Sequence, residues 1–123
     1  RSLEEAGIRP VAGAADLHAA REAAARVEVA PAVMAYLVDI CRATRTSPAV
    51  RLGVSPRGAT ALLRTSRVWA FLQGRGFVTP DDVKTMAPST LAHRLGLRAE
   101  ANLEGITAVN VISGVLAATP VPR

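Results

Sequence analysis

The sequence predicts an all-α fold, a small helical bundle, and three observations carry this prediction. Of the 123 residues, 50% are hydrophobic, so the chain is able to bury a core of its own. Only 3% are aromatic, which leaves Ala, Leu, Val and Ile to fill that core, as in closely packed helices. Proline and glycine divide the chain into short segments whose apolar residues recur at helical spacing.

The first two helices are expected at residues 14–26 and 31–45. A loop that contains Arg9-Pro10 precedes the first helix, and Pro31 suits the first position of the second. A further loop is expected over residues 46–54. Apolar residues recur on one face of each segment: Leu17, Ala20, Ala24 and Val27 in the first, and Val33, Leu37, Ile40 and Cys41 in the second.

Ser55-Pro56 is the clearest helix start in the sequence. A serine hydroxyl caps the free amides of a first turn, and a proline ring already has the φ of the first helical residue. The helix that begins there is expected to end near Gly74, because glycine readily adopts the left-handed conformation that stops a helix.

Thr79-Pro80 repeats this start signal and is followed by Asp81 and Asp82, carboxylates that the positive end of a helix favours. This helix is expected to break at Pro88 and to resume over residues 91–95.

The stretch 96–105 is the least regular part of the chain. Phe77-Val78 or Leu95-Gly96-Leu97 is a candidate for one minimal strand pair. A final helix is expected to begin at the Thr107 cap and to end before Pro120.

Charge and composition exclude several classes of protein. Fifteen basic and ten acidic residues give a net charge of +5, which is modest for a nucleic-acid binder. Cys41 is the only cysteine, and His18 and His93 are the only histidines, so no disulfide and no zinc site is expected. A reducing, cytoplasmic setting fits this cysteine usage. No apolar run reaches the ~18–20 residues of a membrane span, so none is expected.

No catalytic residue is assigned in this chain. It has no glycine-rich phosphate loop ending in Lys-Ser or Lys-Thr, so it is not expected to hydrolyse a nucleotide by itself. Nothing places His18 or His93 beside a Ser or Cys nucleophile. Asp81 and Asp82 are interpreted as an ordinary helix start and not as an acid–base pair.

The candidate binding residues are Ser55, Pro56, Arg57 and Gly58. The first amides of a helix lack partners, the helix dipole adds positive potential, and Arg57 adds a full charge. Gly58 allows a close approach to the backbone, as phosphate sites often require. The residues alone leave a second interpretation open, in which Arg57 is a solvated side chain beside a good cap.

Four strings of residues, in their order and spacing, resemble the C-terminal lid domain of the MoxR family of AAA+ ATPases. A looser similarity runs from about Val11 to Arg123. The resemblance implies that residues 14–123 form the helical lid, and that residues 1–13 are a linker from an upstream AAA+ core absent from this sequence. The strings are Ser55-Pro56-Arg57-Gly58, Ala61-Leu62-Leu63-Arg64, Gly76-Phe77-Val78-Thr79-Pro80-Asp81-Asp82-Val83-Lys84 and Leu91-Ala92-His93-Arg94-Leu95.

The resemblance implies that Arg57 is the sensor-2 arginine, which contacts the γ-phosphate of ATP, with Ser55, Pro56 and Gly58 shaping the helix start. The full-length protein would then be an ATPase that uses ATP and Mg, with no cofactor tightly bound to this chain alone. Arg64, two turns further along, is expected beyond the reach of that phosphate. The resemblance gives His93 and Arg94 no mechanism.

The partners implied by the resemblance are the upstream AAA+ core, neighbouring subunits of a ring oligomer and von Willebrand factor A-domain proteins. The role implied is a chaperone-like one in the maturation or activation of partner complexes.

Two alternatives remain. One is a small histone-like DNA-binding domain, suggested by the Val78-Thr79-Pro80-Asp81-Asp82-Val83 string and the arginine content. The other is a purely structural helical interaction module. No nucleic-acid partner is expected, because a duplex binder gathers its basic residues on one face, whereas these arginines are scattered over all the predicted helices.

Overall fold

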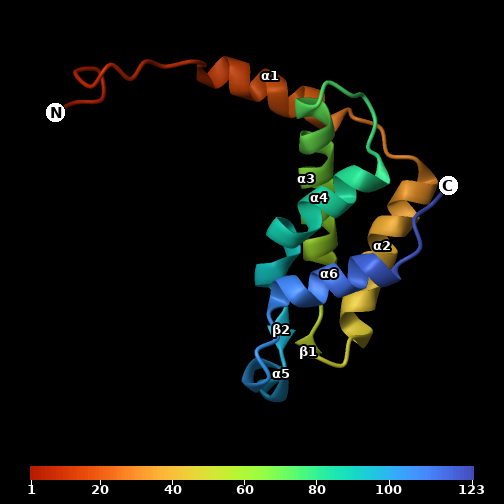
Figure 1. Cartoon of the computed structure of the whole chain (residues 1–123). Coiled ribbons are helices and arrows are strands. Elements are labelled where there is room, and N and C mark those ends of the chain that lie inside the picture. The colour runs from red at the N-terminus through yellow and green to blue at the C-terminus, as the bar shows by residue number, and fades with distance from the viewer.

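The computed structural model describes all residues, 1–123, and confirms a helical bundle with one small strand pair (Figure 1). The helix starts agree closely with those expected from the sequence. In chain order the elements are α1 (Ala14–Ala25), α2 (Pro31–Thr46), β1 (Val50–Leu52), α3 (Pro56–Leu72), α4 (Pro80–Leu91), the 3₁₀ helix η1 (Ala92–Arg94), β2 (Gly96–Leu97), α5 (Ala99–Leu103) and α6 (Ala108–Ala118).

The core lies between α2, α3, α4 and α6, with α3 and α4 as its most extensively packed pair. Each of these four helices contributes a side chain that is completely buried. Burying an aliphatic side chain of this size stabilises a fold by roughly 1.5–3 kcal/mol, so each of these residues contributes substantially to the stability of the bundle. They are Ile40 from α2, Leu62 from α3, Leu91 from α4 and Ile112 from α6.

The helix starts predicted at Ser55, Thr79 and Thr107 are confirmed by side-chain caps. The Ser55 hydroxyl accepts a hydrogen bond from the Gly58 amide at 3.3 Å. Thr79 accepts from the amide of Asp82, and Thr107 accepts from the amide of Asn110. Each cap satisfies an amide that the helix itself leaves unpaired.

The strand pair joins β1 to β2 in an antiparallel arrangement, with Val50 opposite Leu97 and Leu52 opposite Gly96. Gly96 belongs to a predicted strand, but the loop expected over residues 46–54 is partly wrong because it contains β1. Phe77 forms only an isolated bridge with Glu28. A Cβ on Gly96 would lie 3.2 Å from the Cβ of Leu52, so glycine lets the two short strands approach closely.

The break predicted at Pro88 is wrong. Helix α4 continues through Pro88 to Leu91, and η1 follows it directly. A proline inside a helix removes the hydrogen bond to the carbonyl four residues earlier. Val83 and Ala87 before Pro88, and Leu91 after it, are fully buried, so packing holds the helix on both sides of the lost bond.

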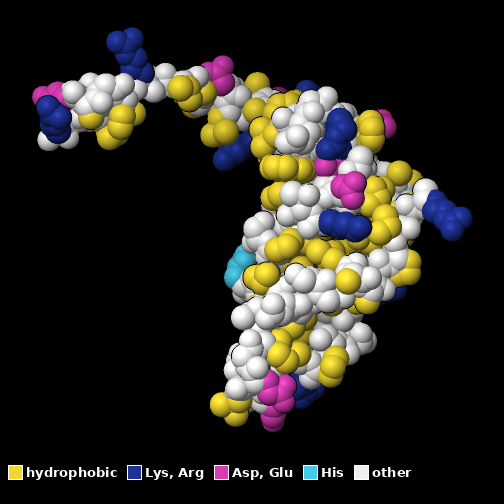
Figure 2. All heavy atoms as spheres, in the orientation of Figure 1, with side chains coloured by type: hydrophobic (Ala, Val, Ile, Leu, Met, Phe, Trp, Pro, Cys, Tyr) yellow, Lys and Arg dark blue, Asp and Glu magenta, His cyan; other side chains and the backbone are white.

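Helix α1 and the residues before it extend away from the bundle as an arm (Figures 1 and 2). Residues 1–13 are exposed throughout, and α1 packs mainly on α3. The apolar face predicted for α1 is only partly buried, because Ala24 is covered while Leu17 is 54% exposed. None of the helices combines the length and the apolar composition needed to cross a lipid bilayer.

Candidate anion-binding site

The start of α3 is anchored on α2 by polar contacts of Val54. The Val54 amide donates to the buried Thr44 hydroxyl at 3.0 Å, and the Val54 carbonyl accepts from Nε of Arg45 at 3.1 Å. A Cβ on Gly53 would lie 2.8 Å from the Cα of Arg45, so only glycine lets the loop pass this close to α2. These contacts fix where Ser55 and the first turn of α3 lie.

Arg57 is exposed at the second position of α3, as expected. Its side chain makes no hydrogen bond and no ion pair within the chain, so all of its N–H groups remain free to donate. Its backbone amide also has no partner, whereas the Gly58 and Ala59 amides are satisfied by Ser55. The first turn therefore presents a free guanidinium and one free amide at the positive end of a helix dipole.

Gly58 has a different role from the one expected. The residue is buried, and a Cβ on it would lie 2.5 Å from Cγ1 of Val54 and 3.3 Å from Cδ of Arg94. The missing Cβ therefore serves the packing of this chain on itself and not the approach of a ligand to the backbone. Gly58 still supports the helix start, because it lets Val54 and Arg94 pack against the first turn.

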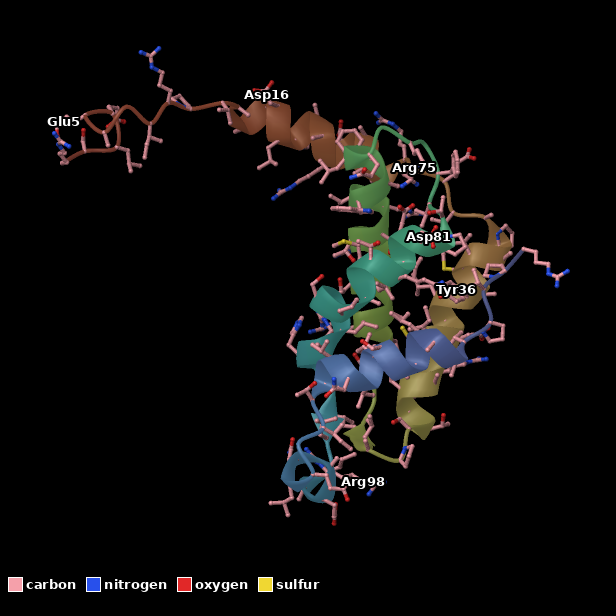
Figure 3. The ribbon with its side chains drawn as sticks, viewed as in Figure 1. Glu5, Asp16, Tyr36, Arg75, Asp81 and Arg98 are labelled. Atoms are coloured by element: carbon pink, nitrogen blue, oxygen red, sulfur yellow. The ribbon has the colours of Figure 1, made fainter.

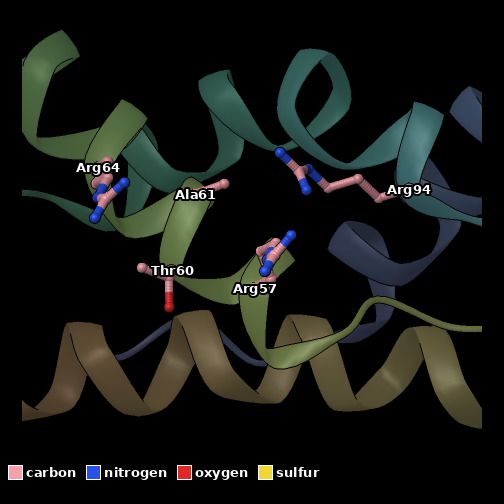
Figure 4. Close-up of a pocket in the computed structure, with 5 residues that line it drawn as sticks. All are labelled: Arg57, Thr60, Ala61, Arg64 and Arg94. Atoms are coloured by element: carbon pink, nitrogen blue, oxygen red, sulfur yellow. The ribbon is translucent and has the colours of Figure 1, made fainter.

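Arg57 lies on an open hollow of about 560 Å³ (Figure 4). Three arginines and no carboxylate line it, so its walls carry only positive charge. Arg64, two turns further along α3, is one of them, so it shares this hollow with Arg57. The lining residues are Arg57, Thr60, Ala61, Arg64 and Arg94.

Arg94 is the residue that sequence reasoning left without a role. It comes from η1 at the end of α4, is half-buried, and donates from Nε to the Thr90 carbonyl at 3.1 Å. Its terminal NH2 groups have no partner in the chain. The string around Arg94 was visible in the sequence, but the position of η1 beside the start of α3 follows only from the tertiary packing.

Charged pairs elsewhere in the chain do not neutralise this hollow. The ion pairs are those of His18 with Glu22 and of Arg75 with Asp82. Asp82 is only 2% exposed and accepts from both terminal nitrogens of Arg75 and from the Thr79 amide. Burial acts to raise the pKa of Asp82, but the hydrogen bonds from Arg75 and Thr79 outweigh it, and the pKa lies below its usual value. Asp82 is thus a structural residue of the helix start, as interpreted from the sequence.

The geometry suits an anion better than a metal ion or a nucleophilic reaction. No three His, Cys, Asp or Glu side chains gather as a metal would require. Burial raises the pKa of Cys41 to about 11, which keeps its thiol protonated and unreactive. The hollow instead offers guanidinium groups, whose planar forks match phosphate and carboxylate oxygens.

Comparison with known families identifies related sequences. The sequence model of a family described as "AAA lid domain" matches residues 42–115. The chain is 37% identical over 115 residues to the protein YeaC of Bacillus subtilis, covering 94% of this chain and 36% of YeaC. It is 32% identical over 131 residues to the protein MoxR of Paracoccus denitrificans, covering 94% and 38%. It is also 32% identical over 117 residues to the chaperone MoxR1 of Mycobacterium tuberculosis, covering 88% and 31%.

The fold is also found in a solved structure. The crystal structure of a candidate ATPase from Cytophaga hutchinsonii matches with a TM-score of 0.78 and 26% sequence identity, over 83% of this chain and 34% of that one. The chain spans about a third of the length of the curated relatives it matches.

Proposed function

This chain belongs to the AAA lid domain family, as a lid of the MoxR group of AAA+ ATPases, and on that basis we propose that it senses bound nucleotide through Arg57. In this proposal Arg57 is the sensor-2 arginine and contacts the γ-phosphate of ATP. The observation that carries the proposal is the free guanidinium of Arg57 at the start of α3, on a hollow lined by three arginines and no carboxylate.

The mechanism rests on a contact that exists in one nucleotide state and not in the other. ATP has a γ-phosphate for Arg57 to bind and ADP does not, so the contact favours the lid position that brings Arg57 to the phosphate. A charge-assisted hydrogen bond of about 1.5–3 kcal/mol shifts such an equilibrium about 10- to 150-fold. Ser55, Pro56 and Gly58 hold the helix start from which Arg57 extends.

For the whole protein we extend the proposal to a cytoplasmic ATPase that uses ATP and Mg. Residues 1–13 then lead from an upstream AAA+ core, and the lid packs on that core within a ring oligomer. A chaperone-like role in the maturation of partner complexes, including von Willebrand factor A-domain proteins, completes the proposal. The name of the Mycobacterium tuberculosis relative, a chaperone, supports the chaperone-like role alone. The match to the AAA lid domain family favours this proposal over the DNA-binding alternative.

The proposal is tested by ATP hydrolysis in the full-length protein. We expect Arg57→Ala to slow hydrolysis at least about tenfold, the value of one lost charge-assisted hydrogen bond. Arg57→Lys should recover part of the rate, because an ammonium keeps the charge but not the fork.

The control variant is Arg98→Ala. The Arg98 side chain lies beside α5 at a separate hollow, together with Glu100 and Glu104 (Figure 3). Arg64 is unsuitable as a control because it lines the same hollow as Arg57. Hydrolysis at the parent rate in Arg57→Ala, or equal damage from Arg98→Ala, would refute the sensor assignment.

A further inference from the structure

We propose that Arg94 acts together with Arg57 as the second guanidinium of one clamp, which binds neighbouring phosphate groups of an oligophosphate chain. This inference rests on the proposed function, because it takes the phosphate chain of the nucleotide as the ligand. It assigns a second contact residue to the hollow, on a different element from Arg57.

The two arginines reach the hollow from two sides. Arg57 extends from the first turn of α3, and Arg94 extends from η1 at the end of α4. Both line the same hollow, and Figure 4 shows the Arg94 side chain extending from η1 toward the α3 side of the hollow, where Arg57 lies. A ligand in this hollow would therefore meet guanidinium groups from two different elements, which a single arginine does not supply.

Arg94 is already positioned for such a contact. Its Nε is occupied by the Thr90 carbonyl, and its Cδ packs over the first turn of α3 at Gly58. The two terminal NH2 groups remain free and carry four N–H donors. Since the stem is already ordered, binding an anion costs less side-chain entropy than it would for a mobile arginine.

Arg75 shows by contrast what an arginine with a structural role looks like in this fold. Its guanidinium is paired with the buried carboxylate of Asp82. Arg94 donates a hydrogen bond only to a backbone carbonyl. No carboxylate forms an ion pair with Arg94, Arg57 or Arg64. Folding thus brings three like charges to one hollow, and a bound polyanion would relieve their repulsion.

The size of the hollow favours an extended anion over a single ion. Its volume of about 560 Å³ falls within the range of small-molecule sites, roughly 300–1,000 Å³. Arg57 and Arg64 stand two turns apart on α3, which is about 10 Å along the helix axis. A chain of phosphates can contact Arg57 and Arg94 at one end and approach Arg64 at the other.

The test is a calorimetric titration of this chain with inorganic tripolyphosphate and, separately, with inorganic phosphate at low ionic strength. We expect tripolyphosphate to bind at least about tenfold more tightly than phosphate, since it meets more than one guanidinium. Low salt is needed because screening weakens contacts between exposed charges.

Two variants isolate the clamp, and a third controls for charge. Arg94→Met keeps an aliphatic stem over Gly58 and removes the guanidinium. Arg57→Met likewise replaces the guanidinium on α3 with an uncharged aliphatic side chain. Each is expected to weaken tripolyphosphate binding at least about tenfold. Arg98→Met makes the same change in net charge at the separate hollow near α5 and should change binding less than about twofold. Circular dichroism establishes that each variant is folded.

Arg94→Lys decides the matter if Arg94→Met fails to fold. It keeps the stem and the charge but loses the planar fork of the guanidinium. We therefore expect its affinity for tripolyphosphate to lie between that of the parent and the about tenfold weaker affinity expected when the guanidinium is lost. Parent-like binding by Arg94→Lys would show that only charge matters and would overturn the clamp.

The remaining outcomes separate this inference from the proposed function. If Arg57→Met weakens binding and Arg94→Met does not, the inference about Arg94 is wrong and the assignment of Arg57 stands. If Arg98→Met weakens binding equally, binding follows net charge and the clamp is wrong. If the unmodified chain does not bind tripolyphosphate, the clamp is also wrong, and ATP hydrolysis in the full-length protein still decides the role of Arg57.

Discussion

The side chain of Arg94 packs against the backbone of Gly58, so that the end of α4 meets the start of α3. A Cβ on Gly58 would lie 3.3 Å from Cδ of Arg94 and 2.5 Å from Cγ1 of Val54. This contact places the guanidinium of Arg94 on the hollow that also holds Arg57. The geometry of the candidate site therefore depends on a residue without a side chain.

Gly58→Ala is expected to lower the free energy of unfolding by about 1–2 kcal/mol. Overpacking of this kind costs about 1–3 kcal/mol, and the better helix propensity of alanine offsets part of it. The matched control is Gly114→Ala in α6, where a new Cβ would meet nothing within 4 Å. The free energy of unfolding of that variant should rise by about 0.5–1 kcal/mol. Urea unfolding of both variants measures the difference, and equal effects would contradict the role given to Gly58.

Asp82→Asn is expected to lower the free energy of unfolding by roughly 1–3 kcal/mol, the cost of breaking buried hydrogen bonds to a charged group. Asp82 is buried and accepts from Arg75 and Thr79, whereas Asp81 is exposed. Asp81→Asn is therefore the control and should change stability by less than about 1 kcal/mol. Urea unfolding at neutral pH compares the two variants. A larger loss of unfolding free energy in Asp81→Asn than in Asp82→Asn would contradict the stabilising role given to the pair of Asp82 and Arg75.

The same carboxylate should make stability depend on pH on the acid side. The pKa of Asp82 is lower in the folded chain than in the unfolded chain, so its contribution is present at pH values above the unfolded value. The contribution is lost as the pH falls from about 4 through the folded pKa. The free energy of unfolding should therefore fall less between neutral and acidic pH in Asp82→Asn than in the parent chain. An equal fall in both proteins would contradict this explanation.

Cys41 should not react with a thiol reagent in the folded chain at pH 8. Burial raises its pKa to about 11, so the thiolate is scarce and also covered. Addition of guanidinium chloride should make the reaction fast, because unfolding exposes the thiol and restores an ordinary pKa. Rapid labelling of the folded chain would show that α2 opens at this position or that Cys41 is not buried in solution.

The parts of the fold that were predictable from the sequence depend on neighbouring residues. Ser55-Pro56, Thr79-Pro80 and Thr107 each pair a cap with the turn that follows it, so the start of the helix is determined locally. The stop after α3 is likewise local, since Gly74 has the left-handed φ of +76° that was expected.

The features that the sequence did not predict depend on contacts between distant segments. The three residues of β1 are too few to show a strand period, and their partner β2 lies far along the chain. Pro88 remains inside a helix because buried residues hold α4 on either side of it. Arg94 could not be connected with Arg57, because only the packing of η1 against α3 brings them to one hollow.

The most direct test of the central claim is the ratio of two affinities in the full-length protein. Dissociation constants are measured for ADP and for a non-hydrolysable ATP analogue in the parent and in Arg57→Ala. The account predicts that Arg57→Ala leaves ADP affinity within about twofold and weakens the ATP analogue at least about tenfold, because the lost contact is to the γ-phosphate alone. An unchanged preference for the ATP analogue in Arg57→Ala would contradict the account.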